Sequence, residues 1–295
     1  MPNARKTTEQ LLKEMESNVD KMYAKKQIEI EKAWNDYMKK QEPKVHSLYA
    51  EMQKAKRTGD SEAIRIATEK YQKALEEVTL KSSEYRNLVN ETKAEITKVN
   101  TEAIDYMNSQ MAEIYSINFN EPVVAGMNQS KLTTDAVRNL AKNDRAFLPY
   151  KQLDKYKDSL WNEKIINSQV MQGIAQGESV YEIAKRMKVV IGMNNSSAIR
   201  NARTMVTAAE NKGKFDSFHR ARQKGVILTK MWLSAHDGHT RNAHLELDGV
   251  EIPLDEEFEN SVGRIMYPGD PEADAANVYN CRCSLVSVVK GFEWE

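Results

Sequence analysis

The chain has 295 residues, with 43 Lys and Arg against 43 Asp and Glu, so its formal net charge is zero. This balance excludes a protein that coats nucleic acid through a strongly basic surface, although it allows a local basic face. Aromatic residues make up only 7% of the chain. Such a low aromatic content is more typical of elongated helices with much solvated surface than of one large compact core.

The N-terminus leads directly into a charged helical pattern, so we expect no signal peptide. No apolar run is long enough to span a bilayer, and we expect no membrane association. The two cysteines lie one residue apart, a spacing that does not suit a structural disulfide. These features predict a protein that folds in the cytoplasm.

The first third of the chain predicts amphipathic helices. Apolar residues recur at steps of three and four from about residue 8 to residue 40. Glu42-Pro43 should interrupt this helix, because proline disfavours helix at the residue before it. From Tyr71 to Tyr106 a stripe follows alternating steps of four and three, which indicates one long heptad helix from about Ser61 to Tyr115. We favour an antiparallel helical hairpin within one chain; the alternative is an intermolecular coiled coil.

A segment rich in Asn, Pro and Gly, residues 117–129, predicts a linker. Further helices follow, and Gly192 to Asn195 should separate the last of them, Ser196 to Lys224, from its predecessor. This last helix is the most basic element and could contact DNA phosphates or an acidic partner, although a solvated face is the simpler interpretation. Its basic residues are Arg200, Arg203, Lys212, Lys214, Arg220, Arg222 and Lys224.

After Gly225 the pattern changes to that of strands. Val226 to Leu233 and Ser284 to Val289 are rich in β-branched residues. Asp248-Gly249 predicts a hairpin turn with Leu247 in the strand before it, and Ile265 to Tyr267 a short strand before a Pro-Gly-Asp-Pro turn.

The expected fold class is therefore α+β and predominantly α. An elongated helical N-terminal arm, a hairpin or coiled coil, should precede a small C-terminal α+β domain. We predict three parts: a helical arm at 1–116, a helical body at 117–225 and the small α+β domain at 226–295.

The C-terminal part holds both cysteines and three of the five histidines. His244, Cys281 and Cys283 are ligands that zinc prefers, and Asp237, His236 or His239 could supply a fourth. The Cys-x-Cys spacing is less common in zinc sites than two to four intervening residues. The alternative is that both cysteines are small apolar residues that face opposite sides of a strand.

Two further interpretations use the same segment. Cys283 could be a nucleophile activated by His244 and oriented by Asn280 or Asp237. The chain has no nucleophile elbow, P-loop or dinucleotide fingerprint, so we expect no enzyme. Alternatively, Asp237 could pair with Arg241 and, together with Arg282, form a polar network that ties the strands together.

This C-terminal series resembles the phage head morphogenesis domain of the minor head proteins of tailed phages, similar to those of phages Mu and SPP1. The matching residues are Trp232, Asp237, Thr240, Arg241, His244, Leu247, Asp248, Gly249, Pro268, Asp270, Pro271, Asn280, Cys281, Arg282 and Cys283. Upstream, Ala202-Arg203-Thr204 resembles the helix that precedes the motif in that family. The resemblance covers roughly Ile165 to Val289.

The resemblance implies a non-enzymatic virion component present in few copies. Such proteins associate with the portal protein inside the head, near the portal vertex, and affect DNA packaging or ejection. Scaffold or major capsid protein and DNA are further partners to expect, and the host cytoplasm is the place of assembly. In this hypothesis the C-terminal cluster stiffens the fold and the helical faces bind the partners.

The resemblance also bears on the metal. Relatives carry His or Cys at the place of His244, which suits a zinc ligand. This chain departs from the pattern where some relatives have a further Cys, at Arg241, or a His, at Val278 or Tyr279. It also has Met205 where relatives often have an acidic residue.

The competing hypothesis is a nuclease-like or transferase-like effector domain that uses His244, Arg241 and Asp237 for acid–base chemistry. In related architectures a toxin domain usually follows this segment. Because the sequence continues for only twelve residues after Cys283, we expect no such extra domain.

Overall fold

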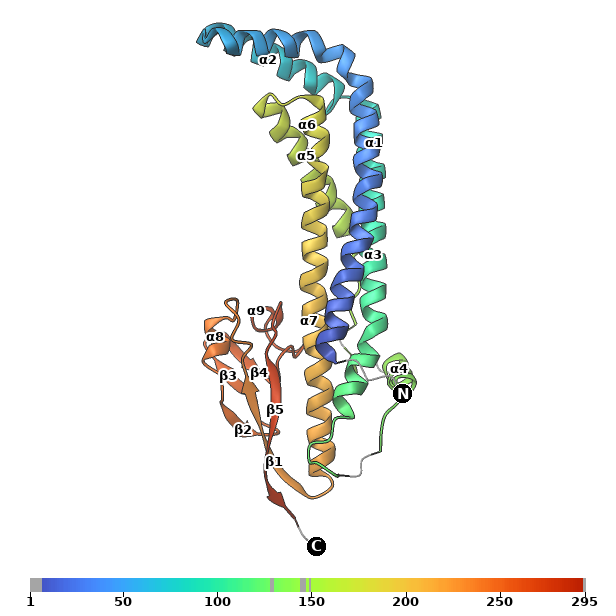
Figure 1. Cartoon of the computed structure of the whole chain (residues 1–295), viewed down its shortest axis with the longest axis vertical. Coiled ribbons are helices and arrows are strands. Elements are labelled where there is room, and N and C mark those ends of the chain that lie inside the picture. Colours follow the sequence, from blue (N-terminus) through green and yellow to red (C-terminus); the bar gives the residue numbers. More distant parts are fainter. Residues whose placement is uncertain (1–6, 128–129, 144–146, 149, 294–295) are drawn as a thin grey trace. The chain divides into compact units, whose positions relative to one another are not determined.

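The computed structural model describes residues 7–127, 130–143, 147–148 and 150–293, and most of them are helical (Figure 1). The helices are α1 (Thr8–Thr58), α2 (Ser61–Val78), α3 (Ser83–Phe119), α4 (Thr134–Asn143), α5 (Lys155–Gln176), α6 (Val180–Lys185), α7 (Met187–Arg222), α8 (Asn242–Leu245) and α9 (Ala275–Val278). The strands are β1 (Val226–Leu233), β2 (Glu251–Pro253), β3 (Phe258–Asn260), β4 (Gly263–Ile265) and β5 (Ser284–Phe292). The predominantly α fold with a small C-terminal α+β region is confirmed.

The chain packs as two compact units, each assembled from separate stretches of sequence. Unit 1 takes the described residues of Met1–Asn18, Ile104–Gln152 and Ala198–Glu295. Unit 2 consists of Val19–Ala103 and Leu153–Ser197. The three-part division at 1–116, 117–225 and 226–295 stays a prediction about domains, since packing groups the residues differently.

Helices α1 and α3 form an antiparallel hairpin within one chain, as predicted. In unit 2 the Trp34 indole Nε1 donates a hydrogen bond to Thr92 Oγ1 at 2.8 Å, and Tyr23 Oη donates to Asn100 Oδ1 at 2.6 Å. A later residue of α1 thus contacts an earlier residue of α3, so the two helices run in opposite directions. The heptad stripe of α3 is therefore buried against α1 of the same chain.

The predicted break at Glu42-Pro43 is wrong, because α1 continues from Thr8 to Thr58 with Pro43 inside it. Proline removes one helical hydrogen bond and costs about 3 kcal/mol in a helix interior. Met38 and Met52, on either side of it, are fully buried. Their packing offsets the cost of the proline, so that tertiary contacts override the local signal.

The predicted single helix from Ser61 to Tyr115 is also wrong, since α2 ends at Val78 and α3 begins at Ser83. At the break, the backbone N–H and the hydroxyl of Thr79 both donate to the carbonyl of Leu75. Thr79 leaves the helical region with φ −119° and ψ −97°. A threonine hydroxyl that bonds its own preceding turn competes with the helix, and here it ends one.

A layer of buried polar side chains joins four helices of unit 2. Asn100 Nδ2 donates to Asp158 Oδ1 and Asn194 Oδ1, at 2.8 and 2.9 Å. Asn194 Nδ2 donates to Asn162 Oδ1 at 2.9 Å, and Asn162 Nδ2 to Asp158 Oδ2 at 3.1 Å. With the Tyr23 bond to Asn100, the layer fixes the register of α1, α3, α5 and α7.

We expect Asn194→Ala to destabilise the protein by about 1–3 kcal/mol, because it removes the hydrogen bonds that Asn194 makes with buried Asn100 Nδ2 and Asn162 Oδ1. Ser196→Ala, two residues further along the same helix at an exposed position, is the matched control and should change little. Urea unfolding of both variants measures the difference. Equal stability of the two variants would contradict the proposed role of the layer.

Helix α7 begins at Met187, so the predicted separation at Gly192 to Asn195 does not exist. Val190 and Ile191 before it and Asn194 within it are buried, and this packing carries the helix through Gly192. The last turn ends at Arg222, and Gly225 follows in the left-handed region at φ 81°, as its position predicted.

The strands of unit 1 form a three-stranded antiparallel sheet in the order β2-β1-β5 and a separate β3-β4 pair. Trp232 lies opposite Leu285, and Lys230 opposite Ser287. The buried face packs on α7 through Phe218 and Ala221. Strand β1 has the predicted bounds, and β5 extends beyond the predicted end.

Asp248-Gly249 does not connect two strands as a hairpin. β1 and β2 are neighbours, but the connection between them contains α8, and Leu247 lies in a turn after that helix. Gly249 still takes the left-handed φ of 73° that the sequence indicates, and its N–H donates to Trp232 O at 2.9 Å. The short strand β4 ends at Ile265, so only the first residue of the predicted strand 265–267 belongs to it.

None of the helices in the described ranges is both long and apolar enough to cross a membrane.

Candidate metal centre and the C-terminal motif

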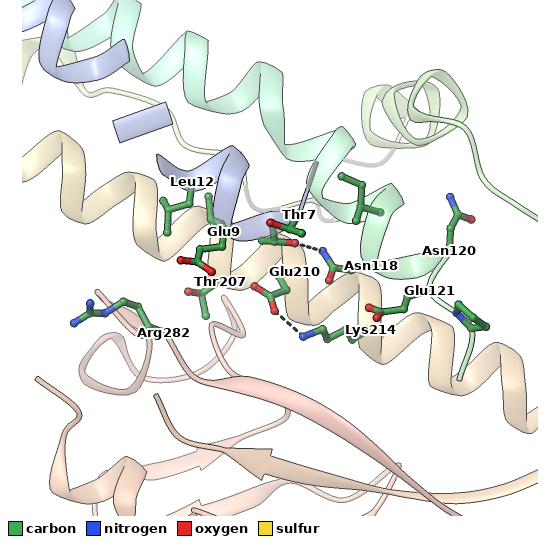
Figure 2. Close-up of a pocket in the computed structure, with 14 residues that line it drawn as sticks. Thr7, Glu9, Leu12, Asn118, Asn120, Glu121, Thr207, Glu210, Lys214 and Arg282 are labelled. Carbon is green, nitrogen blue, oxygen red and sulfur yellow. Dashed lines mark hydrogen bonds and ion pairs between the residues drawn. The ribbon is translucent and has the colours of Figure 1, made fainter. Parts of the chain in front are cut away.

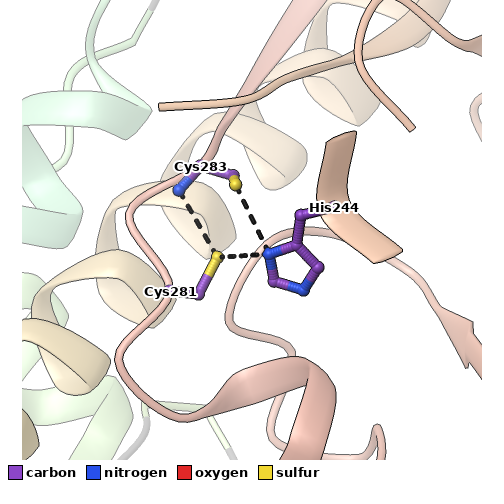
Figure 3. A group of neighbouring side chains, drawn as sticks. All are labelled: His244, Cys281 and Cys283. Atoms are coloured by element: carbon purple, nitrogen blue, oxygen red, sulfur yellow. Dashed lines mark hydrogen bonds between the residues drawn. The ribbon is translucent and has the colours of Figure 1, made fainter. Parts of the chain in front are cut away.

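The side chains of His244, Cys281 and Cys283 meet in the interior of unit 1 (Figure 3). Nδ1 of His244 lies 3.5 Å from the sulfur of each cysteine. One donor atom from each residue lies within 4.8 Å of the others, and all three residues are buried. The three predicted ligands are thus brought together.

A sharp bend before β5 puts both sulfurs on one side. Asn280 adopts a left-handed φ of 57°, and residues 281–283 lie outside any strand. Helix α7 holds the bend: Asn280 N–H donates to Thr204 Oγ1 at 2.8 Å, and Thr207 Oγ1 donates to Cys281 O at 2.6 Å. The alternative with cysteines on opposite faces of a strand is therefore wrong.

The donor distances fit a tetrahedral zinc ion. With zinc–sulfur and zinc–nitrogen bonds of about 2.3 and 2.0–2.1 Å, the edge between a nitrogen and a sulfur ligand is about 3.5–3.6 Å. The two nitrogen–sulfur distances measured here are both 3.5 Å. Two thiols and an imidazole are also the donor set that zinc prefers. The arrangement can therefore hold a metal ion.

The cavity beside these side chains is very small, about 10 Å³. That is about the space of one water molecule, so an ion or a water fits but a substrate does not. Cys283 and His244 are in contact, as a nucleophile and its base would be, yet no room for a reacting group adjoins them. The small cavity argues against a bound substrate, while three protein ligands leave the fourth position of a tetrahedral ion to a water molecule or another group.

The two thiols are electrostatically unequal. A hydrogen bond from Cys281, together with the neighbouring His244, lowers the pKa of the Cys283 thiol below its usual range. The hydrogen bond to Cys283 and burial raise the pKa of Cys281. One thiolate is thus already favoured, which is the form that binds a metal. Nε2 of His244 is buried without a hydrogen-bond partner among the residues described.

The side chains predicted as a fourth ligand have other partners. Asp237 Oδ2 pairs with Arg282 Nη2 at 2.8 Å, and Asp237 Oδ1 accepts from the backbone of His239 at 3.1 Å. His236 Nε2 lies 2.8 Å from Asp248 Oδ2. Within the described ranges the ligand group contains three residues, with His239 at the cavity wall.

The pairing predicted between Asp237 and Arg241 is wrong. Asp237 pairs with Arg282 instead, and Arg241 donates to the carbonyl of Tyr279. Arg241 precedes α8, so its side chain reaches the segment before the cysteines rather than its own loop. The polar network expected around Arg282 exists, but the carboxylate of Asp237 binds Arg282, and Arg241 binds a backbone carbonyl.

Several other motif residues lie in the packing and the turns of unit 1. Trp232 is fully buried and packs edge-on against His244 and Phe258, with ring centroids 5.3 Å apart in both pairs. Pro268 is buried, and Asp270 accepts from the backbone of Met266 at 3.2 Å, which closes the Pro-Gly-Asp-Pro turn. Thr240 Oγ1 donates to Asp237 at 3.3 Å.

The basic residues of α7 are largely engaged within unit 1. Arg203 pairs with Glu16 at 2.6 Å. Lys212 and Lys214 pair with carboxylates one helical turn away, Arg222 pairs with Asp255, and Arg220 donates to the carbonyl of Phe119. Lys224 also has a partner, whereas Arg200 is exposed. DNA or partner contact by this helix stays a prediction.

A second cavity of unit 1, about 680 Å³, is open, and charged side chains make part of its wall (Figure 2). Glu9 from α1, Glu210 and Lys214 from α7, and Arg282 after the bend line it. Because Glu210 pairs with Lys214 at 2.6 Å and Arg282 with Asp237, its charges compensate one another.

Lys230 was not identified from the sequence, where it is one polar residue in an apolar strand. Its side chain is fully buried, and Nζ lies 2.8 Å from Met266 O and 5.1 and 5.3 Å from the ring centroids of Phe215 and Phe258. Burial lowers the pKa of Lys230 to about 8. Only the alternating pattern of β1 could have placed it on the buried face.

We expect stability to rise with pH above 8 because of Lys230. Between the folded pKa of about 8 and the unfolded value of 10.5, the unfolded chain holds a proton that the folded chain has lost. From pH 7.5 to 9.5 this contributes roughly 1–2 kcal/mol. Urea unfolding across this range should show the rise in the natural chain and not in Lys230→Met; equal slopes would contradict it.

Comparisons with known proteins agree with this geometry. Residues 164–286 match the family model described as "Phage Mu protein F like protein". A minor head protein, GP7 of Bacillus phage SPP1, is 31% identical over 161 residues, 54% of this chain and 51% of that protein. An uncharacterized protein, YqbB of Bacillus subtilis, is 29% identical over 132 residues, 43% of this chain and 42% of that protein.

A third relative bears an enzyme's name. The NAD(+)–arginine ADP-ribosyltransferase EFV of Enterococcus faecalis is 32% identical over 149 residues, 49% of this chain but 29% of that protein. The chain thus spans about half or less of the length of these relatives. No solved structure matches the chain significantly.

The matched segment contains α7, the β2-β1-β5 sheet up to the middle of β5, and all three side chains of the metal centre. The resemblance seen in the motif residues is therefore confirmed. Residues 164–286 are thus similar to the Phage Mu protein F like family, and a phage minor head protein is among the relatives of the chain.

Proposed function

We propose that this protein is a minor component of the head of a tailed phage, which associates with the portal protein inside the procapsid and assists assembly, DNA packaging or ejection. The observation that carries the proposal is the family match over residues 164–286, together with the minor head protein of phage SPP1 among the relatives. The virion is then its final location and the host cytoplasm its place of assembly.

The role we propose is not enzymatic. His244 is enclosed in a cavity of about 10 Å³, while Asp237 and Arg241 are bound to Arg282 and to the carbonyl of Tyr279. An effector that used these three residues would need a substrate cleft that they share. The support for the competing enzyme hypothesis is the similarity to a transferase, and the match covers 29% of that protein.

We further propose that His244, Cys281 and Cys283 hold a zinc ion in a structural role. The donor set and the 3.5 Å nitrogen–sulfur distances support it. The ion would join α8 to the bend before β5, two segments that lie about forty residues apart in the sequence. In this role the centre would stiffen the sheet and attach the sheet to α7.

The portal assignment is tested by co-expression of the tagged chain with the portal protein encoded in the same genome. We expect the two to co-purify, and the chain to be found by mass spectrometry in purified virions at few copies per particle. A portal protein from an unrelated phage is the control. The absence of both co-purification and virion incorporation would reject the proposal. Cleavage of DNA or RNA, or arginine modification with NAD, that is lost in His244→Ala would favour the enzyme instead.

A further inference from the structure

The outer edge of β5 carries backbone groups that point away from the sheet. Trp232, which lies opposite Leu285, directs its N–H and carbonyl to Val250 and Gly249 and not to β5. This pair is therefore a non-hydrogen-bonded pair of the antiparallel ladder. It follows that Val286 and Val288 face β1, while Leu285, Ser287 and Val289 present their N–H and carbonyl groups outward.

At its start this edge is satisfied by one side chain of α7. Asn211 Oδ1 accepts from Leu285 N–H at 2.7 Å, and Asn211 Nδ2 donates to Cys283 O at 3.1 Å. The amide thus takes the place that the backbone of a neighbouring strand would occupy. Asn211 bonds no backbone group beyond Leu285, and Lys214 binds the hydroxyl of Ser284, before Leu285, at 2.6 Å.

The rest of the edge has no partner within the ranges that the structure describes. No hydrogen bond involves the outward carbonyl of Leu285, either outward group of Ser287 or the N–H of Val289. Ser284 to Val289 contains no charge and no proline, whereas Lys290 and a register shift of the ladder follow at the end of β5. Proteins usually protect such edges with charges, prolines or bulges, because an uncharged β-branched edge pairs readily with another strand.

A groove adjoins this edge. A cavity of about 230 Å³ is bounded by Leu285, Val286 and Ser287 of β5, by Ser217 and Phe218 of α7, and by residues 118–123. Pro122, Val123 and Phe218 make part of its wall apolar, and Glu121 and Lys214 lie at it. Figure 1 shows β5 between β1 and α7. The space admits one large side chain beside an extended backbone.

We propose that an extended segment of a partner protein pairs with this edge as a fourth strand, next to Ser287, and inserts an apolar side chain between Phe218 and Pro122. Backbone hydrogen bonds would supply the affinity, and the groove the specificity. The groove walls admit a single strand more readily than the whole sheet of a second copy, so the occupant is a partner's segment. The open edge is independent of the proposed role in the phage head, but the choice of partner proteins in the test rests on that role.

The edge itself is tested by amide hydrogen exchange, followed by NMR, on the full chain. We expect the amides of Ser287 and Val289 to exchange rapidly, and those of Val286 and Val288, which donate to β1, to be protected. Slow exchange at Ser287 and Val289 in the free chain would overturn the proposal, because it would mean that the edge is already covered.

The partner segment is tested with overlapping twelve-residue peptides that cover the structural proteins encoded beside this chain. We expect at least one apolar peptide to bind and to slow the exchange of Ser287 and Val289 at least ~10-fold, with little change at Val286. Ser287→Pro removes only an outward N–H and should weaken binding at least ~10-fold. Ser287→Ala keeps this N–H and is the matched control.

Three results would overturn the proposal. The first is that no peptide binds. The second is binding that Ser287→Pro and Ser287→Ala affect equally, since the edge would then not be the contact. The third is self-association of the chain that Ser287→Pro abolishes, which would assign the edge to a second copy. Should Ser287→Pro fail to fold, the exchange rates of the natural chain with and without peptide still decide.

Discussion

Cys283→Ser is expected to abolish metal binding and to lower the free energy of unfolding of the protein by ~5 kcal/mol or more. Structural zinc contributes apparent free energies of about 10–16 kcal/mol to small zinc domains. In this chain, part of the packing of β1 and β5 on α7 would survive without the ion, so the expected loss is smaller. Elemental analysis should give one zinc per natural chain and none in the variant, and thermal unfolding should shift to lower temperature.

His236→Ala is the control for this experiment. His236 lies near the centre in sequence, but its imidazole contacts Asp248 outside the cavity. This variant should retain one zinc ion, and as an exposed ion pair His236–Asp248 contributes little stability. Full stability of the natural chain in a strong chelator, with less than stoichiometric zinc, would reject the metal centre.

Gly269→Ala is the second change with a large expected effect, a destabilisation of about 2–5 kcal/mol. Gly269 has φ 81°, where a side chain costs about 1–2 kcal/mol. A Cβ atom there would lie 2.8 Å from the backbone nitrogen of Ala208 and 2.9 Å from its Cα. Neither α7 nor the turn can retreat without a loss of packing, which adds about 1–3 kcal/mol.

Gly249→Ala separates these two contributions. Gly249 has a similar φ of 73°, but a Cβ atom there meets nothing within 4 Å. The Gly249→Ala variant should therefore be destabilised only by backbone strain, by about 1–2 kcal/mol. Urea unfolding of both variants gives the contribution of the close approach to α7 as the difference. If Gly269→Ala were no worse than Gly249→Ala, the turn would not be docked as described.

The sequence allowed a good prediction of elements whose signals are local. The β-branched run from Val226 gave β1 with its bounds. His244, Cys281 and Cys283 could be grouped because few residue types bind zinc. These inferences need only a residue's chemistry or its immediate neighbours.

Contacts between distant segments could not be predicted in the same way. Asp237 pairs with Arg282 and not with Arg241, because the bend at Asn280 brings Arg282 to the loop. The polar layer of unit 2 depends on Asn100 and Asn194, which lie 94 positions apart and look like surface residues of helices. Pro43 looked like a helix end, and the packing around it decided otherwise.

Unit 1 is assembled from distant stretches of the chain, which has a consequence for its folding during synthesis. Asn118 bonds Thr8, and Arg203 bonds Glu16, so the beginning of the chain packs on residues made much later. At about 5–20 residues per second, the first helical turns wait roughly 10–40 s on the ribosome for α7 to emerge. During that time the apolar stripe of the nascent N-terminus is uncovered. Chaperone dependence during synthesis is therefore expected to be greatest before α7 has been translated.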